Sequence, residues 1–430
     1  MAEIRPFTAL RYAAVDDLSS VLAPPYDVIS PDQQEQLHEL DPHNVIRLEL
    51  ARGGTDQPMA GRYAHAAETL HQWRRQNVLG RDARPAYYPY EERFGGLTRR
   101  GFFATVRLHP WSYGVVLPHE RTRPKPKADR RELLHACRTQ FSPIFSLFED
   151  RDGAVRELLD VATRAEAAAC AQTEAPIFGE IAGGHVLWRT EGQLANRLTM
   201  LLADKQLFIA DGHHRYETAL DYRDERRQVE PDWTPDAPYE LAMMLLVPVE
   251  DPGLVVLPTH RLVTLPAGVE AAALLDCWRE RLAAEAVPLP ASPAAIADEL
   301  ARRGREGHVF AALGLEPGTV HYLTVRAPAD GWPHPATWRD LSVGLLEALI
   351  VEPLQHRYPG TGVEFSRDPA ETLRHAEASP GHLSFLLNPT GVEQILTVAG
   401  AGDRMPEKST YFAPKVATGL VMYPLEPARR

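Results

Sequence analysis

The sequence feature that most constrains the fold is residues 208–220, which read FIADGHHRYETAL. Three apolar residues lead directly into a polar Asp-Gly-His-His-Arg segment, and apolar residues then return at helical spacing. This pattern predicts a short buried strand, a tight turn at Gly212, and a helix whose first turn carries two imidazoles and a guanidinium. We therefore expect the rest of the chain to fold around this strand, turn and helix.

Two interpretations of the polar turn are open. Asp211 is expected to cap the helix, because its carboxylate can accept hydrogen bonds from amides one turn further on. In the simpler interpretation it does no more than this, and His213 and His214 lie on the surface. In the other, the free N–H groups at the helix N-terminus and the fork of Arg215 form an anion site for phosphate or carboxylate. We favour the anion site, because a cap alone does not require so many polar residues together.

The remaining patterns predict an α/β protein of the mixed α+β type. Ser30 is expected to cap a helix that has Pro31 in its first turn. Strands are expected at residues 4–12, 44–50, 86–94, 101–108, 143–148, 185–188, 241–247 and 254–263, and near 309 and 322. Helices are expected at residues 62–79, 131–137, 155–170, 193–203, 267–286 and 293–303.

The last third of the chain looks different from the rest. We therefore expect a motif-bearing catalytic domain at residues 1–265 and a C-terminal α+β lobe at 266–430. The tail of this lobe either folds back to the site or is an ordered tail with no role there. Residues 222–238 are charged and contain prolines, which predicts a solvated loop. The stretch 23–31 is stiffened by prolines and carries Tyr26 and Asp27. It is either the wall of a pocket or a plain connector.

Two polar, proline-rich segments carry further cations. Residues 123–130 are expected to form a basic loop directly behind His119 and Glu120, either as a solvated charge run or as the lining of an anion pocket. Residues 404–415 either close over a phosphate or form an ordered tail. If both segments line the site, its phosphate-binding residues include Lys125, Lys127, Arg130, Lys408, Ser409 and Lys415.

Charge and composition exclude several classes of function. A formal net charge of -12 argues against a general nucleic-acid-binding protein, which normally has a basic surface. The three cysteines do not support a disulfide scaffold or a cysteine-rich zinc site. The first residues are charged where a signal peptide would be apolar, and the longest apolar stretch, 241–249, is too short to span a bilayer. We expect a cytoplasmic protein without nucleic-acid or membrane partners.

The polar residues fit phosphoryl transfer better than other chemistry. The sequence has no P-loop, no dinucleotide-binding glycine motif and no nucleophile elbow. A metal hydrolase is possible from His119, Asp211, His213 and His214, but adjacent histidines on one helix point in different directions. Phosphoryl transfer needs cations and helix amides around phosphates, together with a carboxylate and often a divalent ion. The sequence offers these cations and carboxylates.

Several segments resemble a widespread family of bacterial and archaeal proteins that is defined by a domain of unknown function. The similarity extends nearly from end to end, and the segments that carry it are residues 23–29, 117–122, 208–216, 251–261 and 405–415. The family brings little functional knowledge.

Two shorter segments resemble motifs of the free serine kinases, namely Pro118-His119-Glu120 and residues 211–215. This resemblance implies a ParB/sulfiredoxin-like nucleotide-site core within a larger mixed-sheet domain, with Mg²⁺ and a nucleotide, ATP or ADP, as cofactors. About 90 residues separate the two motifs, so an inserted layer is expected between them. The implied roles are Glu120 as the base on a substrate hydroxyl, Asp211 as metal ligand, Asp211 and His214 as catalytic residues, and His119, Gly212, His213 and Arg215 around the phosphates.

Three hypotheses follow. The first is a nucleotide-dependent phosphotransferase that acts on a small hydroxylated metabolite. The second is a nucleotide-binding or nucleotide-hydrolysing switch protein of the ParB-like class. The third is a metal-dependent hydrolase or lyase that uses the histidines. The expected partner is a small molecule, and a homodimer is an open expectation.

Overall fold

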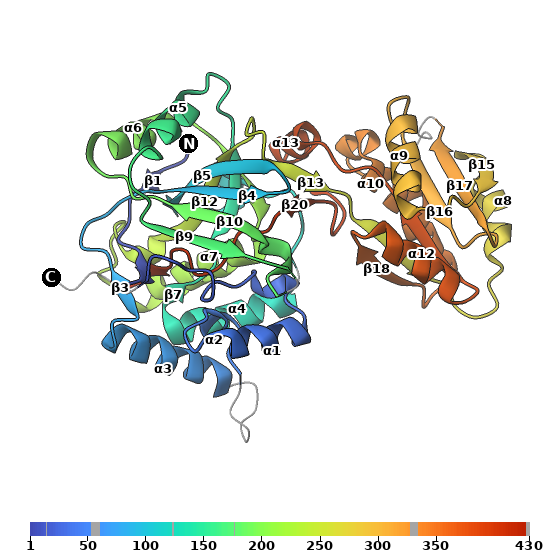
Figure 1. Cartoon of the computed structure of the whole chain (residues 1–430). Helices are drawn as coiled ribbons and strands as arrows, with labels where there is room; N and C mark the ends of the chain where they lie inside the picture. Colours follow the sequence, from blue (N-terminus) through green and yellow to red (C-terminus); the bar gives the residue numbers. More distant parts are fainter. Residues whose placement is uncertain (14, 53–60, 123, 176, 327–333, 427–430) are drawn as a thin grey trace. The chain divides into compact units, whose positions relative to one another are not determined.

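The computed structural model describes residues 1–13, 15–52, 61–122, 124–175, 177–326 and 334–426, apart from the side chains of 124–126 and 272. This part of the chain forms two compact units (Figure 1). The first unit contains residues 1–118, 122–255 and the segment from 413 onward, and the second contains 119–121 and 256–412. Each unit is therefore assembled from separate stretches of sequence. The predicted mixed α+β class is confirmed.

The first unit is built on a nine-stranded mixed sheet in the order β6-β11-β8-β12-β5-β4-β10-β9, with β1 paired to β5. Its strands are β1 (Ile4–Arg5), β4 (Tyr88–Phe94), β5 (Leu97–Arg107), β6 (Val116–Leu117), β8 (Ile144–Phe148), β9 (Ala169–Thr173), β10 (Gly183–Leu187), β11 (Leu207–Asp211) and β12 (Leu241–Pro248). Two short ribbons accompany it, β2 (Leu10–Tyr12) with β3 (Leu79–Arg81), and β7 (Thr139–Gln140) with β21 (Tyr423–Pro424).

The centre of this sheet follows the sequence pattern closely. Every residue of β12 is buried, and the strand lies between β5, to which it is antiparallel, and β8, to which it is parallel. A strand covered on both faces needs a continuous apolar sequence, so the prediction for residues 241–247 is confirmed. The strands predicted at 86–94 and 101–108 are also present, and β4 and β5 form a hairpin that turns at Gly95 and Gly96, which have φ angles of +52° and +80°.

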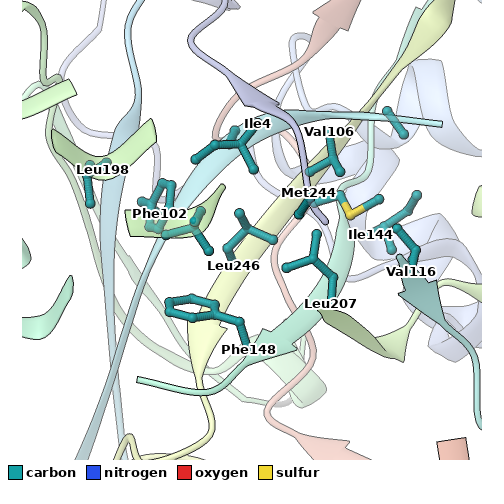
Figure 2. Packing of buried hydrophobic residues seen from close by; sticks show 14 of the residues in the cluster. Ile4, Phe102, Val106, Val116, Ile144, Phe148, Leu198, Leu207, Met244 and Leu246 are labelled. Carbon is teal, nitrogen blue, oxygen red and sulfur yellow. The ribbon is translucent and has the colours of Figure 1, made fainter. Parts of the chain in front are cut away.

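Helices cover both faces of the sheet, with α5 and α6 on one face and α1 to α4 on the other (Figure 1). The capping box of Ser30 and Gln33 at the start of α1 confirms the predicted helix start. Burial of each large apolar side chain in the core contributes about 1.5–3 kcal/mol. The main core, in which side chains of α5, α6 and α7 pack on the sheet, includes Ile4, Phe102, Val106, Phe148, Leu198, Leu207 and Leu246 (Figure 2). The helices are α1 (Pro31–Leu40), α2 (Ile46–Glu49), α3 (Gly61–Arg75), α4 (Pro124–Cys137), α5 (Ala154–Ala162), α6 (Gly192–Leu202) and α7 (His213–Val229).

The strand predicted at residues 44–50 is wrong, since this segment contains the short helix α2. The cause is Asn44, whose side chain accepts a hydrogen bond from the Ile46 amide at 2.9 Å. The same side chain donates to the carbonyls of Ser20 and Leu22 at 2.8 and 2.7 Å. An asparagine that bonds to the backbone two residues ahead favours a helical turn over a strand.

The basic loop predicted at residues 123–130 is also wrong from Pro124 onward, because α4 begins there. A proline in the first turn of a helix loses no hydrogen bond, since the N–H groups of that turn have no partner within the helix. The prolines that suggested a stiff loop therefore mark the start of a helix. Arg123 lies outside the described residues.

Three further predicted boundaries are wrong. Within 155–170, α5 ends at Ala162 and the chain then forms β9, whose alternate residues are buried against β10. The predicted loop 222–238 is helical up to Val229, because α7 continues into it. Within 267–286, α8 (Leu274–Trp278) is short and is followed by a strand. In these segments, tertiary pairing overrides local propensity.

The second unit contains a six-stranded antiparallel sheet in the order β15-β17-β16-β19-β14-β18. The helices α9 and α12 supply side chains to the core on this sheet. The strands are β14 (His260–Thr264), β15 (Leu282–Pro288), β16 (Val309–Leu313), β17 (Thr319–Val325), β18 (Gly362–Ser366) and β19 (His382–Leu386), and β13 (Val255–Leu257) pairs with β20 (Tyr411–Ala413). The helices besides α8 are α9 (Pro293–Arg303), α10 (Ser342–Leu346), α11 (Glu352–Arg357), α12 (Pro369–Ala378) and α13 (Val392–Gly400). In the described parts of both units, no helix has the length and apolar character needed to cross a membrane.

Candidate functional site

The strand, turn and helix predicted at residues 208–220 are present. β11 ends at Asp211, and α7 begins at His213. Gly212 joins them with a φ of +97°, a conformation that residues with a side chain rarely adopt. A Cβ at this position would also meet the guanidinium of Arg215 at 3.1 Å. The turn therefore requires glycine.

The prediction that Asp211 caps α7 is wrong. The N-cap residue is Gly212, and no side chain caps the helix. Instead, the carboxylate of Asp211 accepts hydrogen bonds from Arg215 through Oδ2 and from Lys415 through Oδ1. The sequence pattern missed this arrangement because Lys415 lies 204 residues further along the chain. We call Asp211, Arg215 and Lys415 the Asp211 cluster.

The Asp211 cluster is nearly enclosed by protein. The exposed fractions of the side chains are 15% for Asp211, 12% for Arg215 and 7% for Lys415. Burial alone would raise the pKa of Asp211, but the charges of Lys415 and Arg215 hold it well below its usual value. Burial also opposes the charge of Arg215, yet Asp211 and neighbouring acids raise its pKa above the usual value. Two cations therefore converge on one ionised carboxylate.

The two predicted histidines begin α7. His213 is buried, and its charge contributes to the lowered pKa of Asp211. His214 is half-buried in the same turn. The first N–H groups of a helix have no partner within it, so this turn also presents backbone donors. The structure thus brings the predicted Gly212, His213, His214 and Arg215 into one turn beside Asp211.

Lys415 belongs to residues 413–418, which we call the strap. The backbone N–H of Lys415 donates to the carbonyl of Glu180 at 3.1 Å. Further along the strap, Thr418 exchanges two backbone hydrogen bonds with Ala23, at 2.9 and 3.2 Å. Ala23 begins the proline-stiffened stretch that the sequence analysis singled out. That stretch and the C-terminal segment are therefore joined in the first unit.

Arg130 is buried near the Asp211 cluster. It donates to Glu49 Oε1 at 2.9 Å and to Asp129 Oδ2 at 2.8 Å. Its guanidinium lies over the ring of Tyr26, 4.0 Å from the ring centroid. Arg130 and Arg215 line one cavity of about 50 Å³, which has room for only a few water molecules.

The lysines of the predicted basic loop are placed differently. Lys127 makes ion pairs with two acids of α7, Glu217 at 3.4 Å and Asp221 at 2.9 Å. Its ammonium is therefore directed to the side of α7 and is not among the groups bonded to Asp211. The side chain of Lys125 lies outside the described residues.

The predicted residues of the second unit gather around Glu120. Its Oε1 accepts hydrogen bonds from the backbone N–H of Ser409 at 3.1 Å, and from the N–H and hydroxyl of Thr410 at 3.2 and 3.3 Å. His119 Nε2 lies 2.8 Å from the hydroxyl of Thr410, and the His119 carbonyl accepts from the Met405 amide at 2.8 Å. The His-Glu segment and residues 405–410 therefore meet in this unit.

Arg261 is a site residue that the sequence analysis placed in a strand but did not select. Its buried guanidinium donates to the carbonyls of Thr259 at 2.7 Å, Lys408 at 3.1 Å and Glu407 at 3.0 Å. Burial lowers the pKa of Arg261 to about 10. Lys408 is exposed and has a φ of +52°. Arg261 thus fixes the backbone of the turn that binds Glu120, and an arginine within a predicted strand was the signal that could have revealed it.

The donor set limits which metal the described residues can hold. Within the described ranges, no group of three or more His, Cys, Asp or Glu side chains could hold a metal ion. A catalytic zinc site needs three protein ligands, so the hydrolase or lyase hypothesis has no donor set there. Mg²⁺ demands less, because one or two carboxylates and substrate phosphates commonly bind it. Asp211 fits the role of such a carboxylate when phosphates are bound beside it.

Several solved structures are distantly similar to the chain. A mutant of free serine kinase in complex with AMP has 10% sequence identity and a TM-score of 0.37, and the match covers 74% of this chain and 92% of that chain. Another mutant, in complex with ADP, has 13% identity, a TM-score of 0.35 and the same coverage. SbnI from Staphylococcus aureus, with a C-terminal truncation, has 12% identity and a TM-score of 0.37, with coverage of 74% and 87%.

Sequence comparison identifies the family. No curated protein matches the chain. A family model described as a protein of unknown function, DUF1015, matches residues 4–343, which include the Asp211 turn. The resemblance expected from the sequence is confirmed, and the chain belongs to the DUF1015 family.

Proposed function

We propose that this protein is a nucleotide-dependent phosphotransferase that acts on a small hydroxylated metabolite. The observation that carries the proposal is the Asp211 cluster, in which two nearly buried cations converge on one carboxylate at the start of α7. Phosphoryl transfer requires fixed cations and helix amides around phosphate oxygens, because these oxygens carry the charge of the transition state. The cluster and the first turn of α7 offer both kinds of group.

In this proposal Arg215 and Lys415 bind phosphate oxygens, and the backbone N–H groups of the α7 turn add further donors. Asp211 holds Mg²⁺ together with the phosphates, and the ion, when bound, neutralises phosphate charge. Before a phosphate arrives, the same carboxylate keeps the two cations in place. His214 is the further catalytic residue that we propose in this turn.

Glu120 is the proposed base on the substrate hydroxyl. Three hydrogen bonds to its Oε1 orient the carboxylate. Glu120→Gln keeps the shape of the side chain and removes its basicity, so we expect turnover to fall by about 10²–10⁴-fold while nucleotide binding is retained. Glu393→Gln, at an exposed position in the first turn of α13, is the matched control. Unchanged turnover in Glu120→Gln would remove this residue from the mechanism.

A thermal-shift measurement with ATP, ADP and CTP, each with and without Mg²⁺, tests the nucleotide site. A ligand at 100 times its dissociation constant stabilises the folded state by about 2.7 kcal/mol, so binding raises the melting temperature. We expect a shift in the wild type that is lost in Arg215→Ala and reduced in Arg215→Lys, which keeps the charge but not the fork. Arg151→Ala, at a position with 80% of its side chain exposed, should behave as the wild type.

The outcomes separate the hypotheses. No shift with any nucleotide would refute the proposal. A shift without a phosphorylated product from any hydroxylated metabolite would favour the nucleotide-binding switch, because that hypothesis requires the same pocket but no transfer.

A further inference from the structure

Arg99, in β5 of the first unit, is a buried cation that the proposed function leaves unused. Only 1% of its side chain is exposed, and its guanidinium lies over the ring of Phe145 at 4.7 Å. Its Nη2 donates to the carboxylate of Glu92 and, at 2.9 Å, to the carbonyl of Pro414. A buried arginine has a large desolvation cost, so its position calls for a physical reason.

The contact with Pro414 acts directly on the strap. The carbonyl of Pro414 and the N–H of Lys415 belong to the same peptide group. The carbonyl accepts from Arg99 at 2.9 Å, and the N–H donates to the carbonyl of Glu180 at 3.1 Å. Both polar groups of this peptide are therefore fixed by residues outside the strap. The side chain of Lys415, whose backbone N–H belongs to this peptide, donates to Asp211.

The Glu180 carbonyl, which accepts from the Lys415 N–H, lies in the same buried polar region as Arg99. Glu180 lies in the short helix Gly179–Ile181, and the carbonyl of Ile181 is 2.9 Å from His185 Nε2. His185 Nδ1 is 2.6 Å from the hydroxyl of Tyr90 and 4.0 Å from Glu92 Oε1. Burial lowers the pKa of His185, which fits a neutral ring that donates from Nε2 and accepts at Nδ1. His185 thus links Tyr90 to the short helix that contains Glu180, and Glu92, the partner of Arg99, lies beside this histidine.

We propose that Arg99 is a positioning residue, which holds the Pro414–Lys415 peptide so that the Lys415 ammonium meets Asp211. This inference deepens the proposed function, on which it rests, because Lys415 is one of the two cations offered to phosphate. Arg99 acts through the strap and is not itself a phosphate ligand. Among the described residues, its Nε and Nη1 have no hydrogen-bond partner, so its hydrogen bonds are concentrated on Glu92 and the strap.

The test compares a variant that releases the strap with a matched control. Arg99→Met is combined with Glu92→Gln, so that no buried charge is left unpaired. The control is Arg100→Met, because Arg100 is the next residue of the same strand and is 43% exposed. It pairs with the exposed Asp160 and with the buried Glu91, which keeps Arg93 as a second partner. Arg99→Lys, which keeps the charge opposite Glu92, is expected to lie between the wild type and the double variant.

The readout is the rate of acetylation of each lysine, measured by mass spectrometry with an amine-selective reagent. Loss of one buried hydrogen bond should raise the rate at Lys415, relative to Lys205 in the same molecule, by about tenfold in the double variant. The buried thiol of Cys137 reports general opening of the first unit, and its reaction with a thiol reagent should stay at the wild-type rate. The Arg100→Met control should match the wild type at both positions.

The rates at Lys415 and Cys137 decide whether Arg99 positions the strap. A rise confined to Lys415 supports the proposal. An unchanged rate at Lys415, or an equal rise at Lys415 and Cys137, overturns it. The labelling needs no nucleotide, so failure of the wild type to bind nucleotides would refute the proposed function while leaving the role of Arg99 to be judged on these rates alone.

Discussion

Replacement of Asp211 by Asn tests whether charge holds the candidate site together. The substitution keeps the size of the side chain but removes the negative charge that accepts hydrogen bonds from Arg215 and Lys415. Since the exposed fractions of these three side chains are 7–15%, removal of the carboxylate should lower the free energy of unfolding by about 3–5 kcal/mol. Asp221→Asn is the matched control, because Asp221 also pairs with a lysine but is 42% exposed. Its loss should cost about 0–1 kcal/mol.

The assay is chemical denaturation followed by circular dichroism at neutral pH, with and without inorganic phosphate. If the two cations are available to an anion, phosphate should stabilise Asp211→Asn more than the wild type, because it replaces the missing negative charge. A loss below about 1 kcal/mol in Asp211→Asn, equal to that of the control, would contradict the burial argument. A full loss without any greater response to phosphate would leave the cluster as a structural ion pair and would refute its role as an anion site.

Three further predictions follow from the same geometry. The pKa of Asp211 is depressed in the folded state and ordinary in the unfolded chain, near 3.8, so its stabilising contribution is complete above that pH and is lost as pH falls towards the folded value. The difference in denaturation midpoint between the wild type and Asp211→Asn should therefore stay constant down to about pH 4 and shrink as the pH falls further. Gly212→Ala should destabilise by about 1–2 kcal/mol or more from its positive φ, whereas Gly96→Ala, with a similar φ but no atoms near the added Cβ, isolates the backbone cost alone. Arg261→Met should increase amide hydrogen exchange at residues 407–410, measured by mass spectrometry, because three hydrogen bonds from this arginine to backbone carbonyls are lost. Unchanged exchange would show that Arg261 does not hold the backbone of this turn.

The sequence predicted best what local patterns determine. The strand and helix around Gly212, the buried strand β12, and α9 with its bounds all depend on periodicity and on turn or cap residues close in sequence. The prediction for Asp211 went wrong because a distant lysine competes with the nearby amides, and such a partner leaves no local trace. The prolines of α4 suit both a loop and a first helical turn, so the pattern alone does not separate the two.

The supporting residues of the site were the hardest to predict. Arg99 and Arg261 occur in strands, where an arginine normally indicates a solvent-facing position. Their burial follows from backbone carbonyls supplied by residues at 407–408 and 414, far along the chain. The chemistry of these carbonyls does not depend on side-chain type, so neither motif nor composition identifies the partner. Only the fold brings the two together.

The strap has a consequence for how the protein is made. Residues 413–418 follow the whole second unit in the chain, although they complete the first. At about 5–20 residues per second, synthesis of the second unit takes roughly 8–30 seconds, during which Asp211 has Arg215 but no Lys415. The sheet of the first unit can assemble on the ribosome during this interval, while the Asp211 cluster stays incomplete until residues 413–418 have emerged. Biosynthesis thus delays completion of the Asp211 cluster until the second unit has been translated.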